Sequence, residues 1–98
     1  MSNDVSKSPA ERRRARLRFR AERRGFKEVD LIFGAFAHEF LPGLSEAELD
    51  QFEALLKAPD QEVYGWLQDQ APVPDAYDTP VFARLKSLCA RKNPKWNV

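Results

Sequence analysis

The chain has 98 residues, 43% of them hydrophobic, so it has room for one small packed domain with a single core. Residues 1–27 carry ten Lys/Arg and three Asp/Glu (+7), residues 28–90 carry three and twelve (−9), and residues 91–98 carry three Lys/Arg (+3). A basic end joined to an acidic body suits the orientation of one docked partner. The single cysteine excludes an internal disulfide framework, and no apolar run approaches the roughly 20 residues that cross a bilayer.

The first predicted helix has clear start and stop signals. Ser8 supplies an N-cap, Pro9 suits the first helical position, and Glu11 completes a capping box. We expect this helix to run to about Arg24. Gly25 then ends it, because glycine readily adopts the left-handed conformation found at helix ends.

The second predicted helix has the strongest periodic pattern in the chain, and it runs from near Phe26 to about Leu41. Its apolar residues fall on one helical face and are expected to be buried: Val29, Ile32, Phe33, Phe36 and Phe40. Pro42 and Gly43 stop it.

A third and a fourth helix follow. Ser45 and Glu48 form a second capping box, and Pro59 ends the third helix. The fourth helix starts at Asp60 and is followed by a Pro-rich connection, residues 71–75. Apolar stripes at helical spacing predict what these two helices bury: Leu49, Phe52, Leu55 and Leu56 in the third, and Val63, Trp66 and Leu67 in the fourth.

The fifth helix is predicted to start at Asp78-Thr79-Pro80 and to bury Cys89 at its far end. We interpret this cysteine as a buried inert thiol, because no histidine lies near it in the sequence. Five short helices predict an all-α five-helix bundle over residues 9–90. We expect a disordered N-terminal tail at residues 1–8 and a C-terminal tail at residues 91–98.

Signatures of catalysis, cofactor binding and metal binding are missing. The four glycines are too widely spaced for a phosphate-binding loop, and one histidine with one cysteine cannot form a metal cluster. The histidine, His38, is interpreted as a helix-end residue or as a partner contact, and both alternatives stay open. We therefore expect no enzyme activity and no cofactor of the chain's own.

The first predicted helix carries an unusual number of arginines. Eight lie within it: Arg12, Arg13, Arg14, Arg16, Arg18, Arg20, Arg23 and Arg24. They are compatible with a solvated basic face, with protein docking, or with phosphate backbones of nucleic acid. The acidic body would repel nucleic acid, and few aromatic residues interleave with the arginines.

The segment Arg24-Gly25-Phe26-Lys27-Glu28 has two interpretations. Local physics favours an ordinary helix junction, in which Arg24 and Glu28 could pair across a helix start. The alternative is a docking surface, because Gly25 has no side chain and lets another backbone approach closely.

The same segment matches the Arg-Gly-x-x-Glu signature of the succinate dehydrogenase flavinylation-factor family, and the chain resembles that family from about residue 10 to residue 90. Arg23 precedes the signature and Val29-Asp30-Leu31 follows it, which resembles the family's Arg-Arg-Gly-x-x-Glu-Leu-Asp stretch. The segment Phe36-Ala37-His38-Glu39-Phe40 resembles the end of the family's second helix, and Trp66-Leu67 resembles its fourth.

The resemblance implies an assembly factor that binds the flavoprotein subunit of succinate dehydrogenase, or in some bacteria that of fumarate reductase. It implies that the chain promotes covalent attachment of FAD to that subunit, so that the FAD belongs to the partner. The signature positions Arg24, Gly25 and Glu28 would lie at the partner interface. Four neighbouring residues are carried over with them: Arg23, Asp30, His38 and Glu39.

The remaining expectations concern compartment and partners. The N-terminus has no apolar signal-peptide core. It is Arg-rich, as a mitochondrial presequence would be, but Asp4, Glu11 and Glu22 are atypical of one. We expect a cytoplasmic monomer without nucleic-acid or membrane partners. The rival functions are a nucleic-acid-binding protein that uses the basic helix and a small regulatory interaction protein.

Overall fold

The computed structural model describes residues 8–92, which fold into five α-helices with two short 3-10 helices and contain no strand. The elements in chain order are α1 (Pro9–Ala21), α2 (Lys27–Phe40), η2 (Leu41–Gly43), α3 (Glu46–Lys57), α4 (Asp60–Leu67), η3 (Asp75–Tyr77) and α5 (Pro80–Lys92). The predicted all-α five-helix bundle is confirmed. Most of the two expected tails lies outside the described residues.

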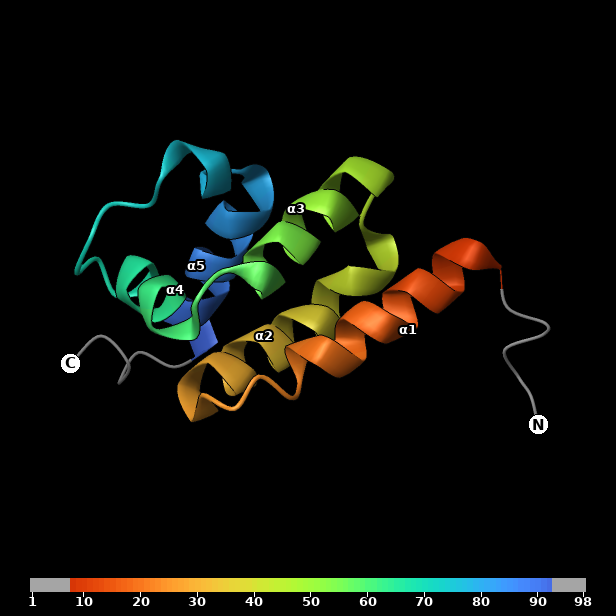
Figure 1. The fold of residues 1–98 in the computed structure, drawn as a ribbon, viewed down its shortest axis with the longest axis horizontal. Coiled ribbons are helices and arrows are strands. Elements are labelled where there is room, and N and C mark those ends of the chain that lie inside the picture. The colour runs from red at the N-terminus through yellow and green to blue at the C-terminus, as the bar shows by residue number, and fades with distance from the viewer. Residues whose placement is uncertain (1–7, 93–98) are drawn as a thin grey trace.

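The helices pack around α2 and α3. In Figure 1, α1 runs alongside α2, and α4 and α5 lie toward the other end of the molecule. Helix α1 contacts α2 and α3, whereas α5 contacts α2, α3 and α4. The turn between α1 and α2 therefore lies at the edge of the bundle, close to α4.

Both predicted capping boxes are present. The Ser8 hydroxyl accepts from the Glu11 N–H at 3.1 Å, and the Glu11 carboxylate accepts from the Ser8 N–H at 2.9 Å. Ser45 and Glu48 repeat this arrangement at 3.2 and 2.9 Å. Each box satisfies N–H groups that a helix start would otherwise leave unpaired, so it fixes where α1 and α3 begin.

One predicted helix boundary is wrong. Helix α1 ends at Ala21, not near Arg24. The reason is that the Arg24 side chain is held against α3 and α4, which draws the chain out of the helix. Helix α5 continues to Lys92, beyond the expected end of the domain at residue 90.

The core consists of the apolar stripes that the periodicity predicts. Three phenylalanines lie at its centre, with ring centroids 5.8 Å apart for Phe33 and Phe52 and 5.2 Å apart for Phe36 and Phe52. Full burial of each such side chain stabilises the fold by about 1.5–3 kcal/mol. Phe40 is only partly buried at the rim, and its ring packs on Phe36 at 5.1 Å. Cys89 is buried as expected, and burial raises the pKa of its thiol.

A membrane-crossing helix would have to be longer and more apolar than any helix found in residues 8–92.

Candidate functional site

The turn between α1 and α2 places the Arg-Gly-x-x-Glu segment at the surface of the bundle. After Ala21 the chain makes one loose helical turn, in which the Arg23 N–H donates to the Arg20 carbonyl at 3.3 Å. Gly25 then takes a positive φ of 93°, the left-handed conformation expected of it. Helix α2 starts two residues later.

The Arg24 side chain turns inward and is only 8% exposed. Its guanidinium donates to the Leu56 carbonyl at 2.6 Å, to the Ala58 carbonyl at 2.9 Å and to the Asp60 carboxylate at 2.5 Å. The two carbonyls lie at the C-terminal end of α3, where helix carbonyls lack partners and the helix dipole is negative. Asp60 is the first residue of α4. Arg24 therefore ties the turn to the corner between α3 and α4.

The same guanidinium lies over the Phe33 ring, 5.1 Å from its centroid. The contact with the Phe33 ring and the hydrogen bonds of its N–H groups together fix the orientation of the Arg24 guanidinium plane. Within the described residues, Arg24 pairs with Asp60 and not with Glu28, so the pairing considered from the sequence does not form. Asp60 lies 36 positions along the chain, and no local pattern pointed to it.

Asp30 fixes the backbone of the turn. Its carboxylate accepts from the Arg24 N–H at 2.8 Å and more weakly from the Gly25 N–H at 3.4 Å. These are charge-assisted bonds to N–H groups of the turn, which lie outside both helices. Asp30 thus acts on the inner side of the turn, by holding its backbone.

Gly25 is the open point of this turn. A Cβ atom added there would meet nothing within 4 Å, so steric crowding from the bundle does not explain the glycine. The positive φ does favour glycine, because a side chain in that conformation is strained. A partner backbone could approach this position without meeting a side chain.

The outer face of α2 gathers several predicted site residues. Glu28, Leu31, His38 and Glu39 recur at the spacing of one helical face, pointing away from the core stripe. Leu31 is 54% exposed and, with Phe19, is one of two large apolar side chains exposed among the described residues. Leu31 was not among the predicted site residues, although its place outside the apolar stripe is visible in the sequence.

The polar residues on this face differ in whether their side chains have a partner within the chain. The Glu28 side chain is half-buried and forms no hydrogen bond or ion pair within residues 8–92. Glu39 is exposed and pairs with Arg91 at 3.5 Å, and His38 is exposed in the last turn of the helix. The exposed position agrees with both interpretations of His38.

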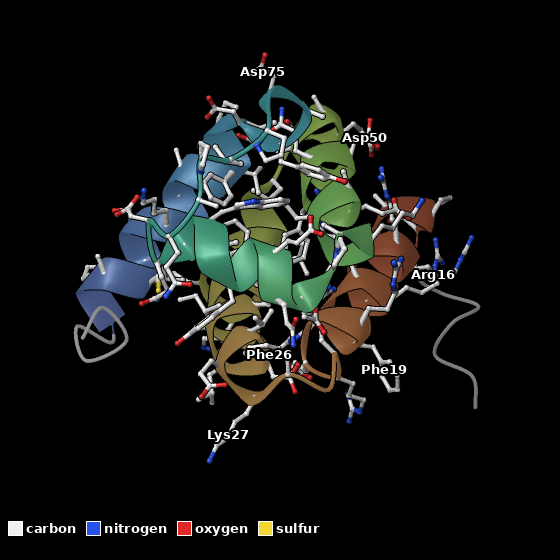
Figure 2. All side chains as sticks on the ribbon, turned by 60° about the vertical axis from the view of Figure 1, so that its left-hand side comes forward. Arg16, Phe19, Phe26, Lys27, Asp50 and Asp75 are labelled. Carbon is white, nitrogen blue, oxygen red and sulfur yellow. The ribbon has the colours of Figure 1, made fainter. Side chains whose placement is uncertain are left out.

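Two neighbours define the edge of the site. Figure 2 shows Lys27 pointing away from the bundle and Phe26 beside it at the start of α2. The Phe26 ring packs on Tyr64 of α4, with centroids 5.3 Å apart. The variable positions of the signature therefore contribute one residue to the bundle and one to solvent.

Two arginines of α1, Arg13 and Arg20, bind carboxylates of the chain's own acidic body. Arg13 donates to Glu46, Asp50 and Glu53 of α3 at 3.1, 2.6 and 2.9 Å. The hydrogen bonds to Asp50 and Glu53 raise the pKa of Arg13, and the bond from Arg13 lowers the pKa of Glu53. Arg20 also reaches Glu53, at 3.6 Å. Part of the charge asymmetry is thus neutralised inside the molecule.

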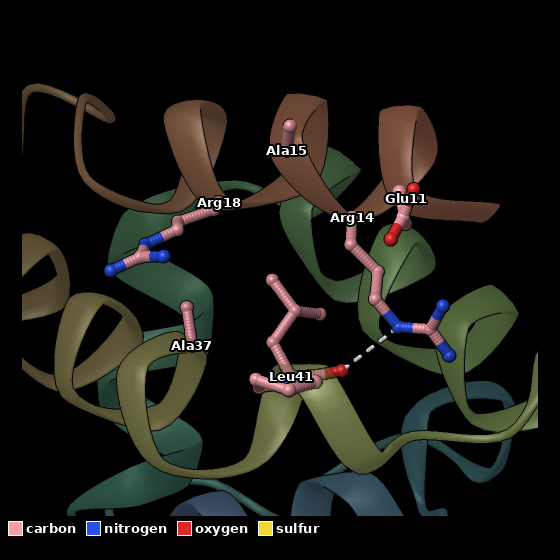
Figure 3. A pocket seen from close by; sticks show the side chains of 7 residues that line it. Glu11, Arg14, Ala15, Arg18, Ala37 and Leu41 are labelled. Atoms are coloured by element: carbon pink, nitrogen blue, oxygen red, sulfur yellow. Dashed lines mark hydrogen bonds between the residues drawn. The ribbon is translucent and has the colours of Figure 1, made fainter. Parts of the chain in front are cut away.

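A cleft of about 290 Å³ separates α1 from the end of α2. Figure 3 shows Arg14 and Arg18 extending toward it from α1, with Ala37 and Leu41 opposite. Arg14 donates to the carbonyls of Leu41 and Leu44 at 3.2 and 2.6 Å, and Arg18 pairs with Glu22 at 3.7 Å. Because both guanidinium groups have partners, the cleft offers little to an anionic ligand.

Comparison with known proteins adds an independent observation. Residues 15–89 match the family model described as flavinator of succinate dehydrogenase. The chain is 37% identical over 86 residues to "Succinate dehydrogenase assembly factor 2, mitochondrial" of Debaryomyces hansenii, covering 85% of this chain and 61% of that protein. It is 30% identical over 89 residues to the protein of the same name in Dictyostelium discoideum, covering 91% and 62%.

A third relative is "FAD assembly factor SdhE" of Acetobacter pasteurianus, 37% identical over 73 residues, with 74% of this chain and 67% of that protein covered. The chain thus spans about three fifths of the first two relatives and two thirds of the third. The resemblance stated from the Arg-Gly-x-x-Glu segment is confirmed at the level of the family.

Proposed function

Because this chain belongs to the family of flavinators of succinate dehydrogenase, we propose that it is an assembly factor for the flavoprotein subunit of that enzyme. It binds the subunit and promotes the covalent attachment of FAD to it. Its relatives carry the names succinate dehydrogenase assembly factor and FAD assembly factor, which support this proposal. A fumarate reductase subunit is a client of the same kind.

The observation that carries the proposal is that the residues of the signature have two different structural roles. Arg24 and Asp30 hold the turn rigid from inside. Gly25 leaves its outer side open, and Glu28 offers a carboxylate that no described residue engages. A half-buried, unpaired carboxylate forms strong charge-assisted hydrogen bonds once a partner supplies donors. The docking surface is therefore Gly25, Glu28 and the adjoining outer face of α2.

The other residues of this surface contribute in different ways. Leu31 supplies apolar area at the centre, and covering it with the partner removes that area from water. His38 and Glu39 extend the contact toward the far end of α2. Arg23 is exposed and contributes to the rim, whereas Arg24 and Asp30 act by positioning the turn.

The mechanism we propose is catalysis by positioning. FAD belongs to the flavoprotein subunit, which also supplies the histidine that becomes linked to it. This chain holds the subunit in the geometry that aligns the two reacting groups, and such alignment can lower a barrier by about 7–11 kcal/mol in favourable cases. The chain acts as a chaperone-like factor and contributes no nucleophile of its own.

The names of the relatives differ in the cellular compartment that they give. The Debaryomyces and Dictyostelium relatives are named mitochondrial, whereas the name of the Acetobacter relative carries no such word. The cytoplasm stays a prediction.

The test is to co-express the flavoprotein subunit with this chain and to measure covalent flavin by its fluorescence in a denaturing gel. Gly25→Arg is expected to reduce covalent flavin at least about tenfold, because it strains the turn and fills the open approach. Glu28→Gln is expected to reduce it to a similar extent, because it removes the charge from the contact.

Two controls make the result interpretable. Circular dichroism has to show that both variants are folded. Glu62→Gln changes an exposed first-turn carboxylate of α4 and should leave covalent flavin at the wild-type level. If folded Gly25→Arg and Glu28→Gln both support wild-type flavinylation, this surface is not the docking site. If the wild-type chain itself has no effect, the function is wrong.

A further inference from the structure

The outer side of α1 carries a second surface, which adjoins the proposed docking surface of α2 at Arg23. Ala15 and Phe19 form an apolar spot that Arg16 and Arg20 border. Phe19 is 58% exposed, and Figure 2 shows it and Arg16 projecting away from the bundle. The Arg23 guanidinium lies over the Phe19 ring, 4.1 Å from its centroid, which keeps this charge beside the spot.

The charges on this side are weakly neutralised. The Arg16 side chain forms no ion pair or hydrogen bond with any residue of the described chain. Arg23 shares Glu22 with Arg18, at 3.6 and 3.7 Å. All three side chains of that group are solvent-exposed, and exposed pairs of this kind contribute little. The outer side of α1 is therefore apolar at its centre and positive around it.

The inner side of the same helix shows what such a surface binds. There Arg13 meets three carboxylates of α3, at Glu46, Asp50 and Glu53. Their spacing of four and three residues puts them on one face of α3. Leu17, on the inward side of α1, is buried in the core beside this contact. Within the chain itself, α1 thus packs against an acidic helix face that has an apolar contact beside it.

We infer that the outer side of α1, made by Ala15, Arg16, Phe19 and Arg23, is a second docking surface. Its occupant is an acidic helix face of the flavoprotein subunit that carries an apolar side chain to cover Phe19. The inference rests on the proposed function and extends it: the client contacts the open turn and α2 with one part and the arginine helix with another. Contacts on two helices would orient the client better than one contact could.

The composition of the surface favours protein over other anionic partners. Nucleic acid held by its backbone requires a series of phosphate contacts, and single strands require several stacking rings. This surface offers one ring, and Arg13 and Arg20 are already paired with α3. A helix that lies in a lipid surface needs a broad apolar face, whereas this one has only Ala15 and Phe19.

The experiment is calorimetric titration of the chain into the purified apo flavoprotein subunit, at about 50 mM and about 300 mM salt. Phe19→Ala is expected to weaken binding about tenfold at both salt concentrations, because it removes the central apolar contact. Arg16→Glu is expected to weaken binding about tenfold at low salt and less at high salt, because salt screens exposed charges. Arg84→Glu reverses a charge on α5 and should bind as the wild type does.

The outcomes separate this inference from the proposed function. If the wild-type chain binds and Gly25→Arg abolishes binding, while Phe19→Ala and Arg16→Glu bind normally, the second surface does not exist and the function stands. If the wild-type chain does not bind the subunit at all, both fail. A third outcome would also overturn the inference. If Arg16→Glu binds the subunit as the wild type does but loses binding to duplex DNA or to anionic phospholipid vesicles, the surface has another occupant.

Discussion

The side chains of Arg24 and Glu28 lie at the two ends of one five-residue signature and face different surroundings. Arg24 is 8% exposed, and its guanidinium has three oxygen partners from α3 and α4. Glu28 is half-buried, and no residue of the described chain bonds to it. The signature of this chain thus contains residues of two kinds: Arg24 is engaged inside the bundle, and Glu28 is left for the partner that we propose. Loss of function alone cannot distinguish them, whereas stability can.

The largest expected effect on stability is that of Arg24→Ala. It leaves two carbonyls at the end of α3 without their donor and Asp60 without its counter-ion. We expect a loss of about 2–3 kcal/mol in the free energy of unfolding, or about 10–20 °C in Tm. Thermal denaturation followed by circular dichroism measures it.

Arg23→Ala is the matched control for that measurement, because it removes the adjacent arginine, which is exposed. It should change the free energy of unfolding by no more than about 0.5 kcal/mol. Arg24→Lys should fall in between, since an ammonium group keeps the charge but cannot reach three acceptors with a planar fork. If Arg24→Ala melts as the wild type does and still fails in flavinylation, Arg24 contacts the client directly.

A smaller effect is expected from the clamp between α1 and α3, and it depends on pH. The bond from Arg13 lowers the pKa of Glu53 in the folded state below its ordinary value. Its contribution to stability is therefore complete above the unfolded pKa, about 4.3, and is lost as pH falls through the folded value. Wild-type stability should decline between about pH 5 and pH 3.

Arg13→Met keeps the apolar stem and removes the charge. It should lower the free energy of unfolding by about 1 kcal/mol at neutral pH, because a charge network near the surface is worth little more. Its decline toward acid should be shallower than that of the wild type. Urea titrations at several pH values measure both curves. Parallel curves would mean that the clamp does not contribute to acid sensitivity.

The sequence predicted what depends on near neighbours. Capping boxes such as that of Ser8 and Glu11 span three residues, and apolar stripes repeat within a single helix, so they can be recognised before the fold is known. The partners of Arg24 lie 32 to 36 positions away, and those of Arg13 lie 33 to 40 positions away. Such contacts depend on how the helices pack, which no local pattern specifies.

The charge asymmetry shows the same limit. A basic end and an acidic body predicted an external partner, and α3 is in part that partner. What remains unneutralised after folding, Arg16 above all, could be identified only once the internal pairs were known. Family resemblance supplied the proposed function, and the packing of the helices divided the signature into inner and outer residues.

The smallest expected effect on stability, and the sharpest test of the contrast, is that of Glu28→Gln. The substitution keeps the shape of the side chain and removes a charge that no described residue engages. Only the favourable interaction of a carboxylate with the start of α2 is lost, so the free energy of unfolding should fall by no more than about 0.5 kcal/mol. Glu62→Gln, in the first turn of α4, loses the same interaction and should melt alike. Covalent flavin should fall for Glu28→Gln and not for Glu62→Gln. A Tm for Glu28→Gln as low as that of Arg24→Ala would mean that both ends of the signature build the fold, and the division between them would be wrong.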